Sequence, residues 1–241
     1  MTDLITVSQA VMWNIPCPGT PTVTDVEGNV YNTVQIGNQC WMKENLRTKK
    51  YRYTGDILEG THLGEISEAS TNKYYFLYNN NENLIRTFGY LYNWYAAINS
   101  DDSNTVVEAD DEIQGICPDG WHLPNSGDFG DLGEFVRDYL YDHFPDADFS
   151  VQFQYFKEAG TEHWDTGNDG NNISGFSALP GGYRNIYGEY MHLGSQAQFW
   201  ASRSYENNYA DGIYLLLNNQ WPGWNEKSRR NEGKSIRCIK D

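Results

Sequence analysis

ICPDGWHLPNSGDFGDLGEFVRDYL, residues 116–140, carries the clearest structural signal in the chain. Ser126 is a residue type that caps helices, and Asp128 and Asp131 would follow in the first turns, where the helix dipole favours negative charge. Apolar side chains recur at helical spacing at Phe129, Leu132, Phe135, Val136, Tyr139 and Leu140. The pattern predicts one amphipathic helix that begins near Ser126.

Upstream of this helix, two β-prone segments, residues 23–26 and 30–36, are separated by the turn formers Glu27-Gly28-Asn29. They predict a β-hairpin near the N-terminus. Residues 89–98, GYLYNWYAAI, are dense in aromatics and are expected in the core. Residues 48–83 are polar without a sustained period, so we expect a surface excursion and assign it no chemistry.

Downstream of residue 171, short apolar pieces alternate with glycines and polar stretches, which is typical of successive short strands. The pieces are GFSALPGGYR (175–184), FWASRSY (199–205), GIYLLL (212–217) and SIRCIKD (235–241). The predicted fold class is therefore α+β: loop-rich, with short antiparallel sheets and one or two helices.

Charge and hydropathy exclude two classes of partner. Acidic residues outnumber basic ones by 33 to 17, and basic side chains gather only at 47–52 and 229–230, too few for a nucleic-acid-binding stripe. No apolar stretch approaches the ~20 residues that a membrane helix needs. Residues 4–13 lack the features of a signal peptide, so any export signal or lipid anchor is expected outside this sequence.

The four cysteines, Cys17, Cys40, Cys117 and Cys238, fit neither a CxxC metal cluster nor a thioredoxin-like motif. An even count in an aromatic, loop-rich chain indicates two disulfides, which we assign as Cys17 with Cys40 and Cys117 with Cys238. The alternative is four free, buried thiols in a cytosolic protein.

Seven motifs in order carry a family resemblance: TVTDVEGNVYNTVQIGNQCWMKENLRT (22–48), GYLYNWYAA (89–97), ICPDGWHLPNSGDF (116–129), AGTEHW (159–164), SGFSALPGGYR (174–184), FWASRSY (199–205) and SIRCIKD (235–241). The sequence resembles the Fibrobacter succinogenes major paralogous domain from about residue 20 onward. We divide the chain into an N-terminal extension, residues 1–19, and a single domain, residues 20–241.

This resemblance implies a fold similar to C-type-lectin-like domains and formylglycine-generating enzymes, in which an N-terminal and a C-terminal strand pair. It places Cys238 in the element that closes the fold. Members of the family are typically exported, often as lipoproteins or adhesin-like surface proteins of Bacteroidetes. The implied location is extracellular or at the cell surface.

Residues 203–241 also resemble the variable proteins of diversity-generating retroelements, because exposed-type Asn, Tyr, Asp, Ser and Arg interrupt a core-like skeleton. Tyrosine and tryptophan supply rigid contact area, and serine and asparagine supply adaptable hydrogen bonds. The alternative is the polar face of ordinary strands and loops. The candidate ligand contacts are Tyr205, Asn207, Tyr209, Asp211, Trp221, Trp224, Asn225 and Arg229.

Catalytic and metal-binding signals are weak. Formylglycine-generating enzymes use two cysteines in their C-terminal part, where this chain offers only Cys238, and no GxSxG nucleophile motif is present. The histidines lack ligand spacing, and His122 and His163 beside tryptophans favour a packing role. The lectin tripeptides EPN and QPD are also absent.

The loop DTGNDGNN, residues 165–172, could hold calcium through Asp165, Asn168 and Asp169, although turn chemistry alone explains the sequence. We predict no other cofactor.

The sequence predicts a non-enzymatic, ligand-binding or adhesin-like surface protein of a gut Bacteroidetes-type bacterium. Its partner would be a protein or glycan on another cell or surface. The alternative is a structural or assembly component of a cell-surface or fimbrial complex, and a distant one is a formylglycine-generating-type enzyme.

Overall fold

The computed structural model describes residues 14–143, 153–206, 208–217 and 223–241; side chains of His143 and residues 223–226 are not described. The strands are β1 Thr22–Thr24, β2 Val30–Ile36, β3 Gln39–Met42, β4 Lys50–Tyr51, β5 Gly55–Asp56, β6 Leu58–Glu59, β7 Tyr74–Phe76, β8 Leu91–Tyr92, β9 Trp121–His122, β10 Gly181–Arg184, β11 Tyr190–Leu193, β12 Gln196–Tyr205, β13 Tyr209–Leu216, β14 Gly223–Arg229 and β15 Ile239–Lys240. The helices are η2 Tyr78–Asn80, η3 Glu82–Leu84, α2 Ile85–Phe88, α3 Trp94–Ile98 and α4 Ser126–His143.

The first five-stranded sheet, β1-β2-β3-β15-β9, joins the two ends of the chain. The predicted hairpin is confirmed, since Thr24 pairs with Val30 in antiparallel register. The last strand lies between β3 and β9, with Ile239 opposite Trp41 on one side and His122 on the other. An N-terminal and a C-terminal strand therefore pair, as the family resemblance implied.

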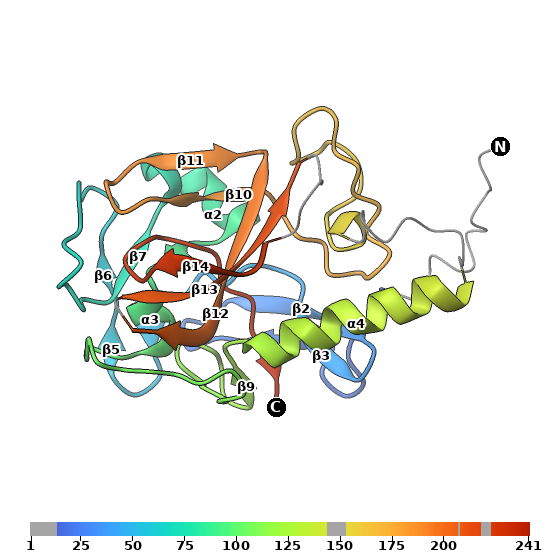
Figure 1. Cartoon of the computed structure of the whole chain (residues 1–241), viewed down its shortest axis with the longest axis horizontal. Helices are drawn as coiled ribbons and strands as arrows, with labels where there is room; N and C mark the ends of the chain where they lie inside the picture. Colours follow the sequence, from blue (N-terminus) through green and yellow to red (C-terminus); the bar gives the residue numbers. More distant parts are fainter. Residues whose placement is uncertain (1–13, 144–152, 207, 218–222) are drawn as a thin grey trace.

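The second five-stranded sheet has the order β11-β10-β12-β13-β14 and consists of the C-terminal part of the chain (Figure 1). Its long central pair, β12 and β13, is antiparallel, with a register shift between Trp200 and Ser204. The structure is thus mostly β, with two larger sheets and few helices among its described residues. This agrees with a loop-rich α+β class.

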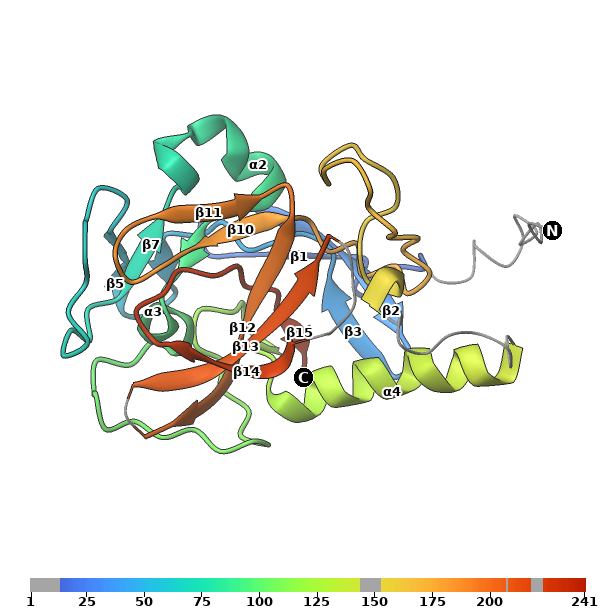
Figure 2. The same ribbon diagram turned by 45° about the horizontal axis from the view of Figure 1, so that its top comes forward.

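Helix α4 confirms the amphipathic helix, and β2 and β3 lie beside it in both views (Figures 1 and 2). Its buried residues Phe129, Leu132, Val136 and Leu140 form one stripe, whereas Phe135 is exposed and Tyr139 half-buried. No described helix is long and apolar enough to span a membrane.

The predicted cap is wrong by one residue. Asn125 is the N-cap: its Oδ1 accepts from the Asp128 amide at 2.9 Å, and an Asp128 carboxylate oxygen accepts from the Asn125 amide at 2.8 Å. This reciprocal pair is a capping box, in which Asp128 takes the place usually held by glutamate or glutamine. Ser126 instead donates its hydroxyl to Asp211.

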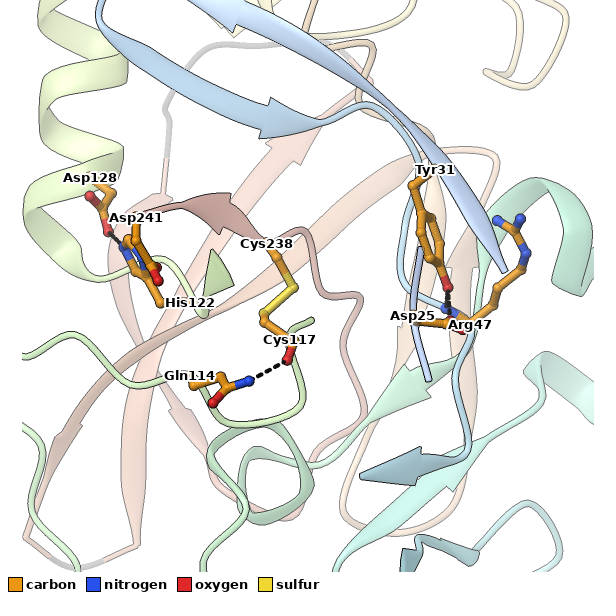
Figure 3. Close-up of a disulfide and its surroundings, with 9 residues drawn as sticks. All are labelled: Asp25, Tyr31, Arg47, Gln114, Cys117, His122, Asp128, Cys238 and Asp241. Carbon is orange, nitrogen blue, oxygen red and sulfur yellow. Dashed lines mark hydrogen bonds and ion pairs between the residues drawn. A yellow bond between two sulfur atoms is a disulfide. The ribbon is translucent and has the colours of Figure 1, made fainter. Parts of the chain in front are cut away.

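Both predicted disulfides are present, Cys17–Cys40 and Cys117–Cys238, and none of the cysteines is free. The first ties residues 14–19 of the predicted extension to the first sheet, where the Gln35 amide also donates to the Ile15 carbonyl. The second links the segment before β9 to the segment before β15 (Figure 3).

The core is aromatic, and the aromatics of residues 89–98 are buried as predicted. Each fully buried indole has a hydrogen-bond acceptor, as burial of its polar N–H requires. Trp94 donates to the Ser202 carbonyl and Trp200 to the Tyr92 carbonyl. These two bonds fasten α3 and β8 to the second sheet.

Residues 48–83 are not simply a surface excursion, so that expectation is corrected. Tyr51, Ile57, Ile66, Tyr75 and Phe76 from this segment are buried. The segment holds β4 to β7, which are too short to show a hydrophobic period.

Five basic side chains are buried: Lys157, Arg184, Arg230, Lys234 and Arg237. All but Lys234 donate to backbone carbonyls, whereas Lys234 donates to the side chains of Gln198 and Tyr214. Lys234 also contacts Glu232 at 3.1 Å. Arg237 donates to the carbonyls of Phe176 and Ser177 and to the side chain of Asn45. Burial lowers the pKa of Arg237 to about 9, which leaves the guanidinium protonated at neutral pH. Four of these cations thus supply donors to carbonyls of loops and strand ends.

His122 on β9 has a polar role rather than the packing role expected from its neighbour Trp121. Its ring lies between two carboxylates, with Nδ1 at 2.8 Å from Asp241 and Nε2 at 3.2 Å from Asp128 (Figure 3). Burial alone would lower the pKa of His122, but hydrogen bonds to Asp128 and Asp241 outweigh it and raise the pKa. The histidine thereby connects α4 to the end of the first sheet.

We expect the stability of the protein to fall as pH rises through the raised pKa of folded His122. A raised folded-state pKa gives a contribution that is complete below the unfolded value of about 6.5 and is lost above the folded value. Urea unfolding from pH 6 to pH 9 should show this loss in the wild type and a flatter profile for His122→Gln. The exposed His62→Gln is the control, and an equal flattening in both variants would contradict the assignment.

Candidate functional site

The predicted contacts converge on the neighbouring ends of β12, β13 and β14. Tyr205 and Tyr209 are cross-strand partners, and Tyr209 in turn lies opposite Arg229. Arg203 is two residues from Tyr205, and Lys227 is two residues from Arg229, so the period of a strand places each pair on the same face. We call Arg203, Tyr205, Tyr209, Lys227 and Arg229 the aromatic–cation face.

Cations lie over both tyrosine rings. The Lys227 ammonium is 4.3 Å from the centroid of Tyr205, and the Arg203 guanidinium is 4.8 Å from the same centroid. The Arg229 guanidinium is 4.3 Å from the centroid of Tyr209. Lys227 is exposed and the other four side chains are half-buried, so the stacked groups remain accessible from solvent. The cation–π contacts restrict the rotamers of both rings.

The charges of this face are only partly compensated. Arg229 pairs with Glu68 at 2.8 Å. Among the residues that the structure describes, neither Arg203 nor Lys227 has a carboxylate within ion-pair distance. In a protein of net charge −16, this local positive charge favours an acidic group on a ligand.

Asp211 was predicted as a contact, but its side chain is fully buried and does not reach the surface. One carboxylate oxygen accepts from the Ser126 hydroxyl at 2.8 Å, and the other has no partner of good hydrogen-bond geometry among the described residues. Burial, followed by interaction with Asp211, raises the pKa of Tyr205. Asp211 therefore supports the aromatic–cation face from beneath and is removed from the contact set.

Arg230 fixes the backbone under this face. Its guanidinium donates to the carbonyls of Tyr205 and Tyr209 and to those of Ser103 and Thr105. The same group lies 4.4 Å from the Trp94 ring. The two tyrosines are thus carried on strand ends that a buried cation holds together.

The side chains of the four remaining predicted contacts are not described by the structure. Asn207 and Trp221 lie outside the described residues, and Trp224 and Asn225 belong to β14 without described side chains. Sequence reasoning missed Arg203, Lys227 and Glu68. The alternation of Arg203 with Tyr205, and of Lys227 with Arg229, could have indicated the first two.

The loop proposed for calcium is held by other contacts. Asp169 pairs with the buried Lys157, and Asn168 donates to the carbonyls of Glu158 and Gly160 and accepts from the Gly170 amide. Turn chemistry and one ion pair therefore account for Asn168 and Asp169, in agreement with the alternative interpretation of this loop. Asp165 is exposed.

Three other ligand atoms, from Glu158, Glu162 and His163, lie within 4.8 Å of one another. Among the described residues, these three side chains are close enough together to hold a metal ion. His163 Nδ1 is 2.9 Å from both carboxylate oxygens of Glu158, so the pair is already satisfied by hydrogen bonding. His163 also packs edge-on against Phe88.

Together, the fold and this face define a disulfide-bonded, mostly β domain with an accessible aromatic and cationic surface at its strand ends. The sequence profile of the Fibrobacter succinogenes major domain family matches residues 34–240. The chain belongs to that family, as its seven motifs predicted. No curated protein and no solved structure matches it.

Proposed function

We propose that the protein is a non-enzymatic, adhesin-like ligand-binding domain, whose aromatic–cation face binds an acidic protein or glycan on another cell or surface. The observation that carries this proposal is the cross-strand pair Tyr205 and Tyr209, with Arg203 and Lys227 beside it and lacking carboxylate partners among the described residues. Tyrosine and arginine are enriched in binding hot spots.

Two features support an extracellular location and a C-type-lectin-like scaffold. Disulfides persist mainly in oxidising compartments, and this chain has two. The pairing of β3 with β15 agrees with the closing strand pair of lectin-like domains.

The bridged state of Cys238 favours binding over formylglycine-type catalysis. Cys238 is fully buried and joined to Cys117, so it supplies no thiolate for nucleophilic attack. The proposed activity is therefore recognition, without a chemical step.

The face also has the arrangement that a retroelement-diversified surface needs. Accessible Tyr205, Tyr209 and Arg229 are carried on strands whose intervening residues Ser204, Ala210 and Ser228 are buried. Changing the former would alter contacts without altering the core. Sequencing beside the native gene tests this: a near-copy of its 3′ end that differs chiefly at adenines supports diversification, and its absence indicates a fixed face.

We expect Tyr205→Ala combined with Tyr209→Ala to weaken ligand binding by about thirtyfold or more, the effect of losing a hot spot of about 2 kcal/mol. Binding is measured on an array of surface glycans and extracellular proteins, and the strongest ligand is then titrated. Because both side chains are half-buried, the free energy of unfolding should fall by no more than about 1.5 kcal/mol.

The matched control is Tyr187→Ala, which removes an exposed tyrosine from the turn between β10 and β11. It should bind as the wild type does. A double variant that keeps full affinity would show that Tyr205 and Tyr209 are not ligand contacts. A double variant that unfolds would show that they are structural residues.

A further inference from the structure

A second candidate site lies in a cavity of about 240 Å³ that shares no residue with the aromatic–cation face. Its walls come from residues 24–26, 50–54, 98–99 and 114–119, and Figure 3 shows three of the lining residues, Asp25, Gln114 and Cys117. The volume lies just below the ~300 Å³ at which pockets for drug-sized ligands begin. It suits a ligand of one or two small rings.

The walls of the cavity are held in place before any ligand binds. Gly115 has φ +56°, and a Cβ there would lie 2.1 Å from the Ala97 carbonyl, so the 114–119 segment packs directly on α3. The Tyr51 hydroxyl donates to the Ala96 carbonyl at 2.8 Å, and Cys117 is bridged to Cys238. A preformed site lowers the ordering cost of binding.

Four charged side chains line the cavity, two of each sign, and each already has a partner. Arg52 pairs with Asp119 at 2.6 Å, and Lys50 pairs with Asp56 at 3.5 Å. The Asp25 carboxylate accepts from the Tyr31 hydroxyl and from three N–H groups. The two positive and two negative side chains cancel, so the lining carries no net charge and favours an uncharged ligand.

The other lining groups combine an aromatic ring with neutral polar atoms. Tyr53 is 78% exposed, the highest exposure among the large hydrophobic residues described, and the Arg52 guanidinium lies 5.5 Å from its ring centroid. The Thr54 hydroxyl accepts from the side-chain amide of Asn99 at 3.3 Å. The side-chain amide of Gln114 donates to the Cys117 carbonyl and to the Asp119 carboxylate. Amide, hydroxyl and paired ionic groups offer both donors and acceptors around the ring.

We propose that this cavity binds a neutral saccharide of one or two rings. The apolar face of a sugar ring would lie on Tyr53, and its hydroxyl groups would bond Asp119, Gln114 and Asn99. An exposed tyrosine beside a paired carboxylate and amides matches the chemistry of an uncharged polyol that carries one apolar face. This site is independent of the ligand proposed for the aromatic–cation face.

The test is an array of neutral hexoses, N-acetylhexosamines and their disaccharides, with sialylated and sulfated glycans beside them, probed with the full chain. We expect binding to neutral saccharides, weakened at least tenfold by Tyr53→Ala and by Asp119→Asn and retained by Tyr53→Phe. Tyr53→Ala should leave the Tm unchanged because the ring is exposed. Tyr187→Ala, from an exposed tyrosine outside the cavity, is the control.

Three results would overturn the proposal. The first is that no neutral saccharide on the array binds. The second is that Tyr53→Ala binds the neutral saccharide with wild-type affinity. The third is a neutral saccharide whose binding is lost in the Tyr205→Ala, Tyr209→Ala double variant and kept in Tyr53→Ala, which would assign that ligand to the aromatic–cation face. Loss of acidic-ligand binding in the double variant alone leaves the cavity proposal intact.

Discussion

Replacing Cys117 and Cys238 together by alanine will lower the free energy of unfolding by about 5 kcal/mol, the largest effect expected from any pair of side chains in this protein. The bridge spans 121 residues, so it removes more chain entropy from the unfolded state than the bridge of Cys17 with Cys40, which spans 23. Both Cys117 and Cys238 are buried, and alanine introduces no polar group into their surroundings.

The internal comparison is Cys17→Ala with Cys40→Ala, for which the same loop-entropy argument gives about 3 kcal/mol. Urea unfolding of both double variants and the wild type at 15 °C measures the difference. A larger loss for the short loop than for the long one would show that local packing, and not chain entropy, determines what each bridge contributes.

Replacing Arg230 by methionine will cost about 3 kcal/mol or more and will also abolish ligand binding by the aromatic–cation face. Methionine fills part of the volume but donates no hydrogen bond, so four partly buried bonds to carbonyls are lost at once. Two of those carbonyls belong to Tyr205 and Tyr209, so the strand ends that carry the contacts would separate. Arg230→Lys should recover little of the lost stability, because one ammonium group cannot donate to all the carbonyls that the planar guanidinium reaches.

Arg229→Met is the matched control for stability only, since the adjacent residue is the same type but its side chain is 33% exposed and pairs with Glu68. Because Arg229 belongs to the aromatic–cation face, Tyr187→Ala remains the control for binding. An exposed ion pair contributes at most about 1 kcal/mol. Chemical unfolding measures stability, and binding to the strongest array ligand measures function. Equal stability losses at positions 229 and 230 would contradict the role assigned to Arg230.

Local signals predicted much of the fold. The turn formers between the two N-terminal strands, the helical spacing from Phe129 to Leu140 and the even cysteine count each correspond to observed structure. The N-cap was displaced by one residue because Asn125 and Ser126 are both good caps. The acidic residue three positions after Asn125, which completes the capping box, distinguishes them, since Ser126 has Phe129 at that position.

The buried cations could not be predicted from sequence. Lysine and arginine are rarely fully buried, so the arginines of residues 203–241 were interpreted as exposed-type residues. Buried Arg230 and Arg237 donate to carbonyls of loops and strand ends, and buried Lys234 donates to the side chains of Gln198 and Tyr214. Asp211 was misplaced for a related reason, since its polarity suggested exposure while Ser126 and the strand register keep it inside.

The candidate site was predicted in part. Tyr205, Tyr209 and Arg229 do share one surface, because strand register brings together residues that are four and twenty apart in the chain. The cavity beside Tyr53 was missed, since four separate segments form it and residues 48–83 show no period that would indicate a wall. Such a site depends on tertiary packing alone.

The most direct test of the central claim is hydrogen exchange of the full chain with and without its strongest array ligand. Binding through the aromatic–cation face predicts slower exchange in peptides that contain Arg203 to Tyr205, Tyr209 to Asp211 and Lys227 to Arg230. Protection confined to other segments, or no protection at saturating ligand, would contradict the claim that these strand ends form the recognition surface.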